Sequence, residues 1–215
     1  MDPAALDLDA ITLALLLLIG LGPKIALVPF LEKTKTLSTE QQRAVGRRMV
    51  FTAVVTAVVV FITGALLLQL LHITSGAVAA AGGIILAILA IRMTLGPGDE
   101  VVRDMEAPAD PQKLAVYPLA VPYLFNPVGI TVLIIASEWA DSLADSALVL
   151  GLVLVVGLLD FLIFSNIDKV ARRIRPTTLV VSEIVFGVLL TAVGVQLFVF
   201  GLRFLGILVP MVPAH

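Results

Sequence analysis

The chain has 215 residues, of which 60% are hydrophobic and 14% charged, and its formal net charge is −2. A soluble domain carries about a quarter charged residues, so this composition indicates a polytopic membrane protein in contact with a lipid bilayer. The small net charge, without a basic cluster interleaved with aromatics, argues against a nucleic-acid partner, and the lack of cysteine excludes disulfides, thiolate metal sites and thiol nucleophiles.

Six apolar segments, each long enough to cross a bilayer, predict an all-α fold with six transmembrane helices. They lie at about 8–31, 49–71, 77–95, 115–137, 146–165 and 178–208. Ahead of the second segment, Ser38 or Thr39 is placed to cap a helix that starts in the polar loop.

A long polar stretch separates the third segment from the fourth and divides the chain into halves. We predict a first three-helix repeat at 1–95, a cytoplasmic linker at 96–114 and a second repeat at 115–215. Three spans per half is an odd number, so the second half must enter the membrane from the opposite side. The sequence therefore predicts a 3+3 inverted repeat, inferred from spacing and topology.

Two of the six segments are broken near their middle by proline and glycine. The first carries Gly-Pro-Lys-Ile at 22–25, and the fourth carries Asn-Pro-Val-Gly at 126–129. The proline of the first break frees a backbone carbonyl one turn earlier, near Ile19, which must face protein or a water-lined cavity. Broken segments at corresponding positions of two halves point to a transporter binding site. We therefore expect the two breaks to meet near mid-bilayer.

A half-helix that begins after a break presents free N–H groups and a positive dipole end to an anionic group. We therefore expect the solute to bind at residues of the two breaks: Gly22, Pro23, Lys24, Ile25, Asn126, Pro127, Gly129 and Thr131. The amide of Asn126 has two interpretations, since it can bind the solute or satisfy the carbonyl that Pro127 frees. The hydroxyl of Thr131 likewise either lines the site or bonds back within its own helix.

Lys24, Asp160 and Glu183 lie deep inside the predicted spans, where a charge is costly and needs a partner. Lys24 lies about 12 Å from the inner boundary at 1.5 Å per residue, and Asp160 and Glu183 lie at similar depth. We hypothesise that Lys24 pairs with one acid, which leaves the other free to bind a proton, Na⁺ or a solute ammonium. The alternative is that both acids are near-interface residues served by water and by Arg172 or Arg175.

The distribution of lysine and arginine predicts the orientation of the chain. Twelve of them lie in the loops after the first, third and fifth segments or, like Arg92, at the flank of such a loop, and none lies in the N-terminal tail, the other two loops or the tail after Arg203. Cytoplasmic loops carry the excess of these residues, so both termini are predicted outside. The acidic start, MDPAALDLD, is then the outer flank of the first span rather than a cleaved leader.

Several motifs together resemble the MarC family of bacterial and archaeal membrane proteins, which includes the SnatA-type amino-acid transporters and lies near the LysE exporters. The motifs are GPKIALVPFLEKT at 22–34, LSTEQQRAVGRR at 37–48, AGGIILAILAIRM at 81–93, PLAVPYLFNPVGIT at 118–131 and the spaced Gly187, Gln196 and Gly201. The resemblance implies a six-span inverted repeat with discontinuous first and fourth helices, located in the bacterial or archaeal inner membrane. It also implies transport of small neutral amino acids, as in some members.

This chain departs from the family pattern at both breaks. The family usually has Asn-Pro followed by glycine at the first break, where this chain has Gly22-Pro23, and Gly-Pro-Gly at the second, where it has Asn126-Pro127. In this chain the Asn-Pro pair therefore occurs at the break of the second half rather than at that of the first.

We predict a secondary transporter of the plasma membrane for a small solute, with neutral amino acids as the leading class. It would work by alternating access at the Pro23/Pro127 breaks, with H⁺ or Na⁺ as coupling ion. The alternatives are a channel-like exporter of small metabolites and a non-transporting structural protein. An enzyme is not expected, because the chain has only His72 and His215 as histidines and carries no HExxH or GxSxG motif; neither a cofactor nor a metal is predicted.

Overall fold

The computed structural model describes residues 10–95, 110–140, 142–173 and 176–208, and in these ranges the regular structure is helical, with no strand. The elements are α1 (Ala10–Gly20), α2 (Pro23–Thr34), α3 (Thr39–Leu71), α4 (Ser75–Leu95), α6 (Pro111–Leu114), η1 (Ala115–Leu124), α7 (Pro127–Trp139), α8 (Leu143–Ser165), α9 (Ile167–Arg173) and α10 (Pro176–Phe204). The all-α fold is thus confirmed. Most of the predicted linker, at 96–109, lies outside the described residues.

Five helical spans in the described residues are long and apolar enough to cross a membrane, and a sixth follows if the bent pair around Asn126 counts as one span. α1 and α2 together make the span Leu13–Thr34. The bent pair joins Pro111–Leu124 to Pro127–Glu138 at an angle of 69°. The prediction of six membrane segments, with breaks in the first and fourth, agrees with this arrangement.

Proline sets the break positions. Pro23 and Pro127 each take the first position of a helix, α2 and α7, where the missing N–H removes no bond. Inside η1, a π-type segment, the backbone leaves helical dihedral angles at Tyr117 and Val121, the residues before Pro118 and Pro122. A residue before proline is pushed out of the helical region by steric contact with the ring.

The second span begins earlier than its apolar residues indicate. α3 starts at Thr39 rather than near 49, because Ser38 and Gln41 form a capping box in which each side chain bonds the other's backbone N–H. The expected cap at Ser38 is confirmed. Gln42, in the first turn of α3, also donates to the carbonyl of Thr34 at the end of α2, 2.8 Å away.

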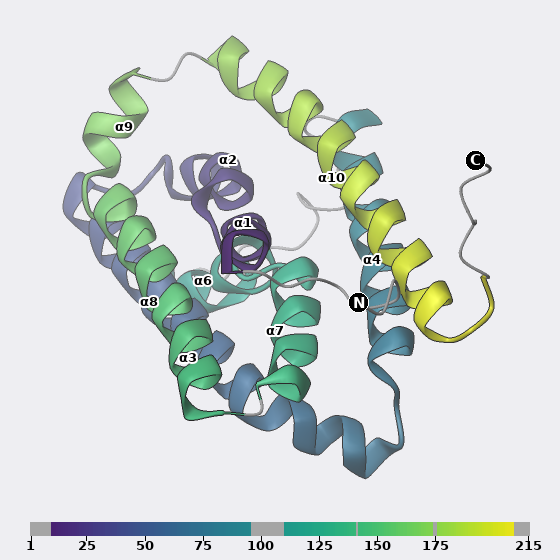
Figure 1. Ribbon diagram of the computed structural model, residues 1–215. Coiled ribbons are helices and arrows are strands. Elements are labelled where there is room, and N and C mark those ends of the chain that lie inside the picture. The colour runs from purple at the N-terminus through teal and green to yellow at the C-terminus, as the bar shows by residue number, and fades with distance from the viewer. Residues whose placement is uncertain (1–9, 96–109, 141, 174–175, 209–215) are drawn as a thin grey trace.

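The helices form two outer pairs around a central group (Figure 1). α3 packs against α8 on one side, and α4 packs along α10 on the other. Between them lie the two broken segments, where α1 contacts α7 and α2 contacts η1. The breaks therefore lie in the interior of the helix arrangement.

α4 and α10 pack through glycine with their backbones in contact. A Cβ added to Gly83 would lie 2.5 Å from the Phe198 nitrogen and 2.6 Å from the Gly194 oxygen. Glycines at 187, 194 and 201 of α10 meet α4 in the same way, at every second turn. Small residues at such positions let helix backbones approach closely in a membrane.

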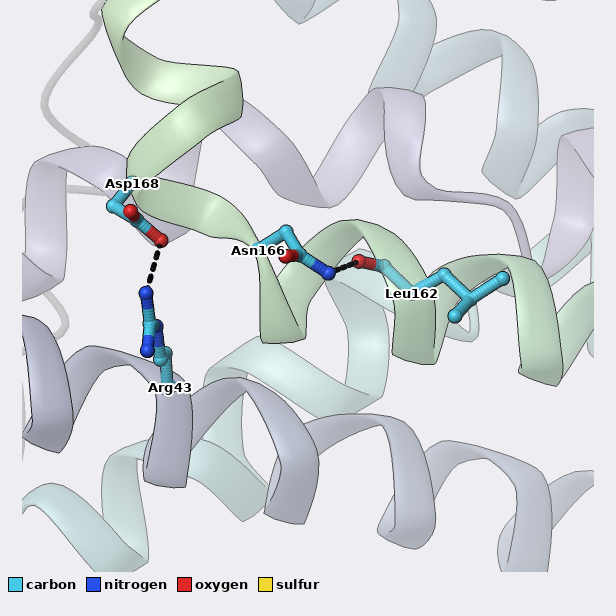
Figure 2. A network of polar contacts seen from close by, with 4 residues as sticks. All are labelled: Arg43, Leu162, Asn166 and Asp168. Carbon is cyan, nitrogen blue, oxygen red and sulfur yellow. Dashed lines mark hydrogen bonds and ion pairs between the residues drawn. The ribbon is translucent and has the colours of Figure 1, made fainter.

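α3 and the α8–α9 segment run antiparallel in a regular register. A Cβ on Gly157 would lie 2.5 Å from Val54, and one on Gly46 would lie 2.9 Å from the Cβ of Phe164. At the polar end, Arg43 donates to Asp168 across 2.8 Å, next to Asn166, whose amide donates to the Leu162 carbonyl (Figure 2). We call the whole packing surface between α3 and the α8–α9 segment, from the Gly157–Val54 contact to the Arg43–Asp168 pair, the α3/α8 seam.

Candidate functional site: the crossing of two broken helices

The two breaks lie in direct contact. The backbone N–H of Asn126 donates to the carbonyl of Gly20 across 2.9 Å, so the end of α1 is bonded to the start of α7. The approach requires glycine on both sides: a Cβ on Gly129 would lie 2.5 Å from the Gly20 oxygen. Gly20 lies in the interrupted run of the first segment, but its partner Gly129 could not be paired with it from the sequence.

Asn126 joins the halves with its side chain as well. Its amide nitrogen donates to the carbonyl of Ile19 across 2.8 Å. In an unbroken helix that carbonyl would accept from residue 23, which is proline and has no N–H. The sequence interpretation paired Asn126 with the carbonyl freed by Pro127. The structure instead pairs it with the carbonyl freed by the proline of the other half.

The two half-helix N-termini differ in capping. At α7, the Asn126 side-chain oxygen accepts from the N–H of Val128 at 2.8 Å and of Gly129 at 3.4 Å. At α2, the N-cap is Gly22, which has no side chain, and no side chain caps the N–H groups that follow. The N–H groups of Lys24 and Ile25 are therefore the uncapped ones at the crossing.

The predicted site residues of the second half are mostly buried in packing. Asn126 is fully buried, and Thr131 is 4% exposed and lies against Gly82 of α4. In the first half, Ile25 is buried, Pro23 is half-buried and the Lys24 side chain is exposed. The structure therefore brings the two breaks together but leaves the first-half residues as the accessible ones.

Lys24 reaches toward α10. Its Nζ lies 4.4 Å from the centroid of the Phe186 ring, a cation–π contact. Glu183 precedes Phe186 by one helical turn, but its side chain lies outside the described residues. No ion pair joins Lys24 to Asp160 in the described part of the chain. Phe186 carried no signal in the sequence, because an aromatic in an apolar span is ordinary.

Asp160, on α8, is fully buried. Neither of its carboxylate oxygens has a hydrogen-bond partner among the residues that the structure describes. Phe164, one turn later, packs on Phe30 of α2 with ring centroids 5.0 Å apart. The carboxyl group therefore lies one turn from the contact that joins α8 to the first broken span. Arg172 and Arg175, its alternative partners, have side chains outside the described residues.

Comparison with known proteins agrees with this architecture. The model of the family described as MarC family integral membrane protein matches residues 8–205. Similar proteins include UPF0056 membrane proteins of Methanocaldococcus jannaschii, 26% identical over 85% of this chain and 90% of the relative, and of Pyrococcus horikoshii, 24% identical over 91% and 97%. A UPF0056 membrane protein of Aquifex aeolicus is 27% identical over 66% of this chain and 68% of the relative. No solved structure matches.

The family match covers nearly the whole chain and both broken segments, and its relatives come from archaea and bacteria. The multi-pass helices of the structure fit the family description. The chain belongs to the MarC family of integral membrane proteins.

Proposed function

We propose that this chain is a secondary transporter that moves a small solute, with neutral amino acids as the leading class, across the plasma membrane. The observation that carries the proposal is the direct contact of two helix breaks inside an apolar protein, with Asn126 bonded to Gly20 and Ile19. Non-helical backbone at membrane depth is tolerated where it is buried in protein or lines a cavity, and transporter binding sites are typically formed by such discontinuous helices. A binding role rather than an enzymatic one fits a crossing built mainly from backbone groups.

The solute carboxylate would bind at the start of α2. The N–H groups of Lys24 and Ile25 have no side-chain cap, and the positive end of the helix dipole attracts an anion. The Lys24 ammonium, exposed beside Phe186, would contribute the charge. Glu183 precedes Phe186 by three residues in the sequence, and it is the acid of α10 that we expect to pair with Lys24 or to meet the solute ammonium.

The pairing of elements supports the 3+3 inverted repeat, since many transporters that work by alternating access are built from inverted repeats. Each predicted span of the first half contacts its counterpart in the second: α1 and α2 contact α7 and η1, α3 contacts α8, and α4 contacts α10. A pseudo-two-fold axis in the membrane plane would give this pattern. Both termini would then lie outside the cell, as the lysine and arginine distribution predicts.

Two measurements on the purified protein test this function. A panel of amino acids should include one that raises the unfolding temperature, since a ligand at 100 times its Kd stabilises by about 2.7 kcal/mol. That ligand, radiolabelled, should show counterflow in proteoliposomes. A pore would conduct it without trans-stimulation. A structural protein would neither bind nor move any member of the panel, and either result would refute the proposal.

A further inference from the structure

The position of Asp160 in the α3/α8 seam can be read from its neighbours on the helix. Gly157, three residues earlier, faces Val54, and Phe164, four residues later, faces Gly46. Residues three and four apart share a helix face. Asp160 therefore faces α3 between those two contacts, at the level of Val50, which is itself 3% exposed.

Among the side chains that the structure describes, the helices packed against this part of α8 place no charge beside it. α3 has no ionisable residue between Arg48 and His72, and α1 has none at all. On α9, Asp168 is bonded to Arg43, and Lys169 is exposed. On α2, Lys24 lies against Phe186, and Glu32 and Lys33 follow at the polar end of that helix. No cation in the described residues therefore neutralises the Asp160 carboxylate.

We propose that Asp160 is a proton-binding site, which carries its proton as a neutral carboxylic acid in the state described here. A buried carboxylate without a cation or hydrogen-bond donor is strongly disfavoured, and such a group takes up a proton instead. Release of the proton would leave a charged carboxylate facing Val50. Loss of the proton therefore requires that α3 and α8 separate at the seam. As part of a transport cycle the site rests on the proposed function, and its coupling ion is then H⁺.

The surroundings do not suit Na⁺. A sodium site in a transporter draws on carbonyls of unwound backbone, whereas α3 and α8 run without interruption from Thr39 to Leu71 and from Leu143 to Ser165. Their carbonyls are used within the helices. A single carboxyl group that has no hydrogen-bond partner among the described residues can bind a proton but cannot complete a metal coordination shell.

Polar atoms in the α3/α8 seam also suggest from which side of the membrane a proton would reach Asp160. Two further buried polar atoms without a hydrogen-bond partner are the hydroxyl of Ser165, five residues after Asp160 on α8, and the Nε of Arg43, whose guanidinium forms the ion pair with Asp168 at the polar end of the seam. Polar atoms that are buried without partners are the groups that water serves. The proton would therefore exchange with the predicted cytoplasmic side.

Infrared spectroscopy of the full-length protein in lipid at neutral pH tests the site without any solute. The wild-type protein should show the carbonyl stretch of a protonated carboxylic acid, and Asp160→Asn should abolish it. Asp160→Glu should keep a protonated-acid band at a shifted frequency. Glu138→Gln, which removes an exposed acid, should leave the band unchanged. A wild-type protein without the band, or a band that survives in Asp160→Asn, would overturn the proposal.

A second measurement separates this site from the proposed function. With the solute found by the panel, Asp160→Asn should retain counterflow but lose accumulation driven by a pH gradient. Accumulation that persists in Asp160→Asn would overturn the coupling role. A band that depends on Asp160 in a protein without any transport activity would uphold the proton site and refute only the transporter.

Discussion

The side-chain amide of Asn126 donates to the backbone carbonyl of Ile19 across 2.8 Å. A residue of the second half therefore satisfies the carbonyl that Pro23 leaves without a helical donor in the first half. The two residues are 107 positions apart. The same side chain also caps α7 through its oxygen. Asn126 is therefore a structural link between the halves, and its loss should affect stability before it affects binding.

Asn126→Ala should destabilise the protein by about 2–4 kcal/mol, from about 1 for the lost cap and about 1–3 for a buried carbonyl left unpaired. Chemical denaturation in detergent measures the change. Asn166→Ala is the matched control, because that amide also donates to a helix carbonyl, at 2.9 Å, but at an exposed position (Figure 2). Equal effects of the two variants would contradict the assigned role.

The contact between Gly20 and Gly129 leaves no room for a methyl group. Gly129→Ala would place a Cβ 2.5 Å from the Gly20 oxygen and 2.8 Å from its carbonyl carbon. The expected cost of such overpacking is about 1–3 kcal/mol. Gly151→Ala is the control, since a Cβ there meets nothing within 4 Å and the change should stabilise α8 by about 0.5–1 kcal/mol. Thermal unfolding of the two variants should shift in opposite directions.

Lys24→Met should weaken solute binding. A charge-assisted hydrogen bond contributes about 1.5–3 kcal/mol, which corresponds to roughly a 10- to 100-fold loss of affinity. Lys24→Arg should retain most of the binding, because it keeps the charge. Lys169→Met, at an exposed position on α9, should have no effect. The measurement is ligand-dependent thermal stabilisation, and unchanged affinity in Lys24→Met would remove Lys24 from the site.

Val50→Lys tests the register of the α3/α8 seam. The new ammonium should pair with Asp160, whereas in the Asp160→Asn background it would be a buried lone charge. Breaking a buried ion pair costs about 3–5 kcal/mol. The loss of stability caused by Asp160→Asn should therefore be larger by about that amount in the Val50→Lys protein than in the wild-type protein. Val58→Lys, two turns along α3, should show no such coupling. A double-mutant cycle of unfolding free energies provides the comparison.

The absence of cysteine makes the predicted orientation directly testable. Leu143, 91% exposed after the turn that follows α7, should react as cysteine with an impermeant maleimide added to intact cells. Lys35, exposed between α2 and α3, should react as cysteine only after the cells are opened. The reverse pattern would place the termini inside.

The sequence was informative wherever the cause of a feature is local. The breaks at Pro23 and Pro127 follow from the missing N–H of proline, and the start of α3 ahead of its apolar residues follows from the cap at Ser38, which the sequence predicted. The apolar runs located all the spans because a membrane helix needs a long apolar stretch.

The features that sequence reasoning missed depend on contacts between distant residues. The partner of the Ile19 carbonyl, the close approach of Gly20 to Gly129 and the position of Lys24 over Phe186 all join different helices. Nothing in the local sequence around Phe186 distinguishes it from an aromatic that faces lipid. The burial of Asp160 could be expected from its depth, but the charge-free surface opposite it needed the α3/α8 register.

The backbone contact of α4 with α10 limits how this protein can change shape. Two helices that touch through glycines at 83, 187, 194 and 201 have no side-chain layer in which one could rotate or slide past the other. Any rearrangement near Lys24 must therefore displace Phe186 and its whole neighbour helix together, as a rigid body. Movement is then left to the surfaces between the α4–α10 pair and the rest of the molecule, and gating movements would be concentrated there.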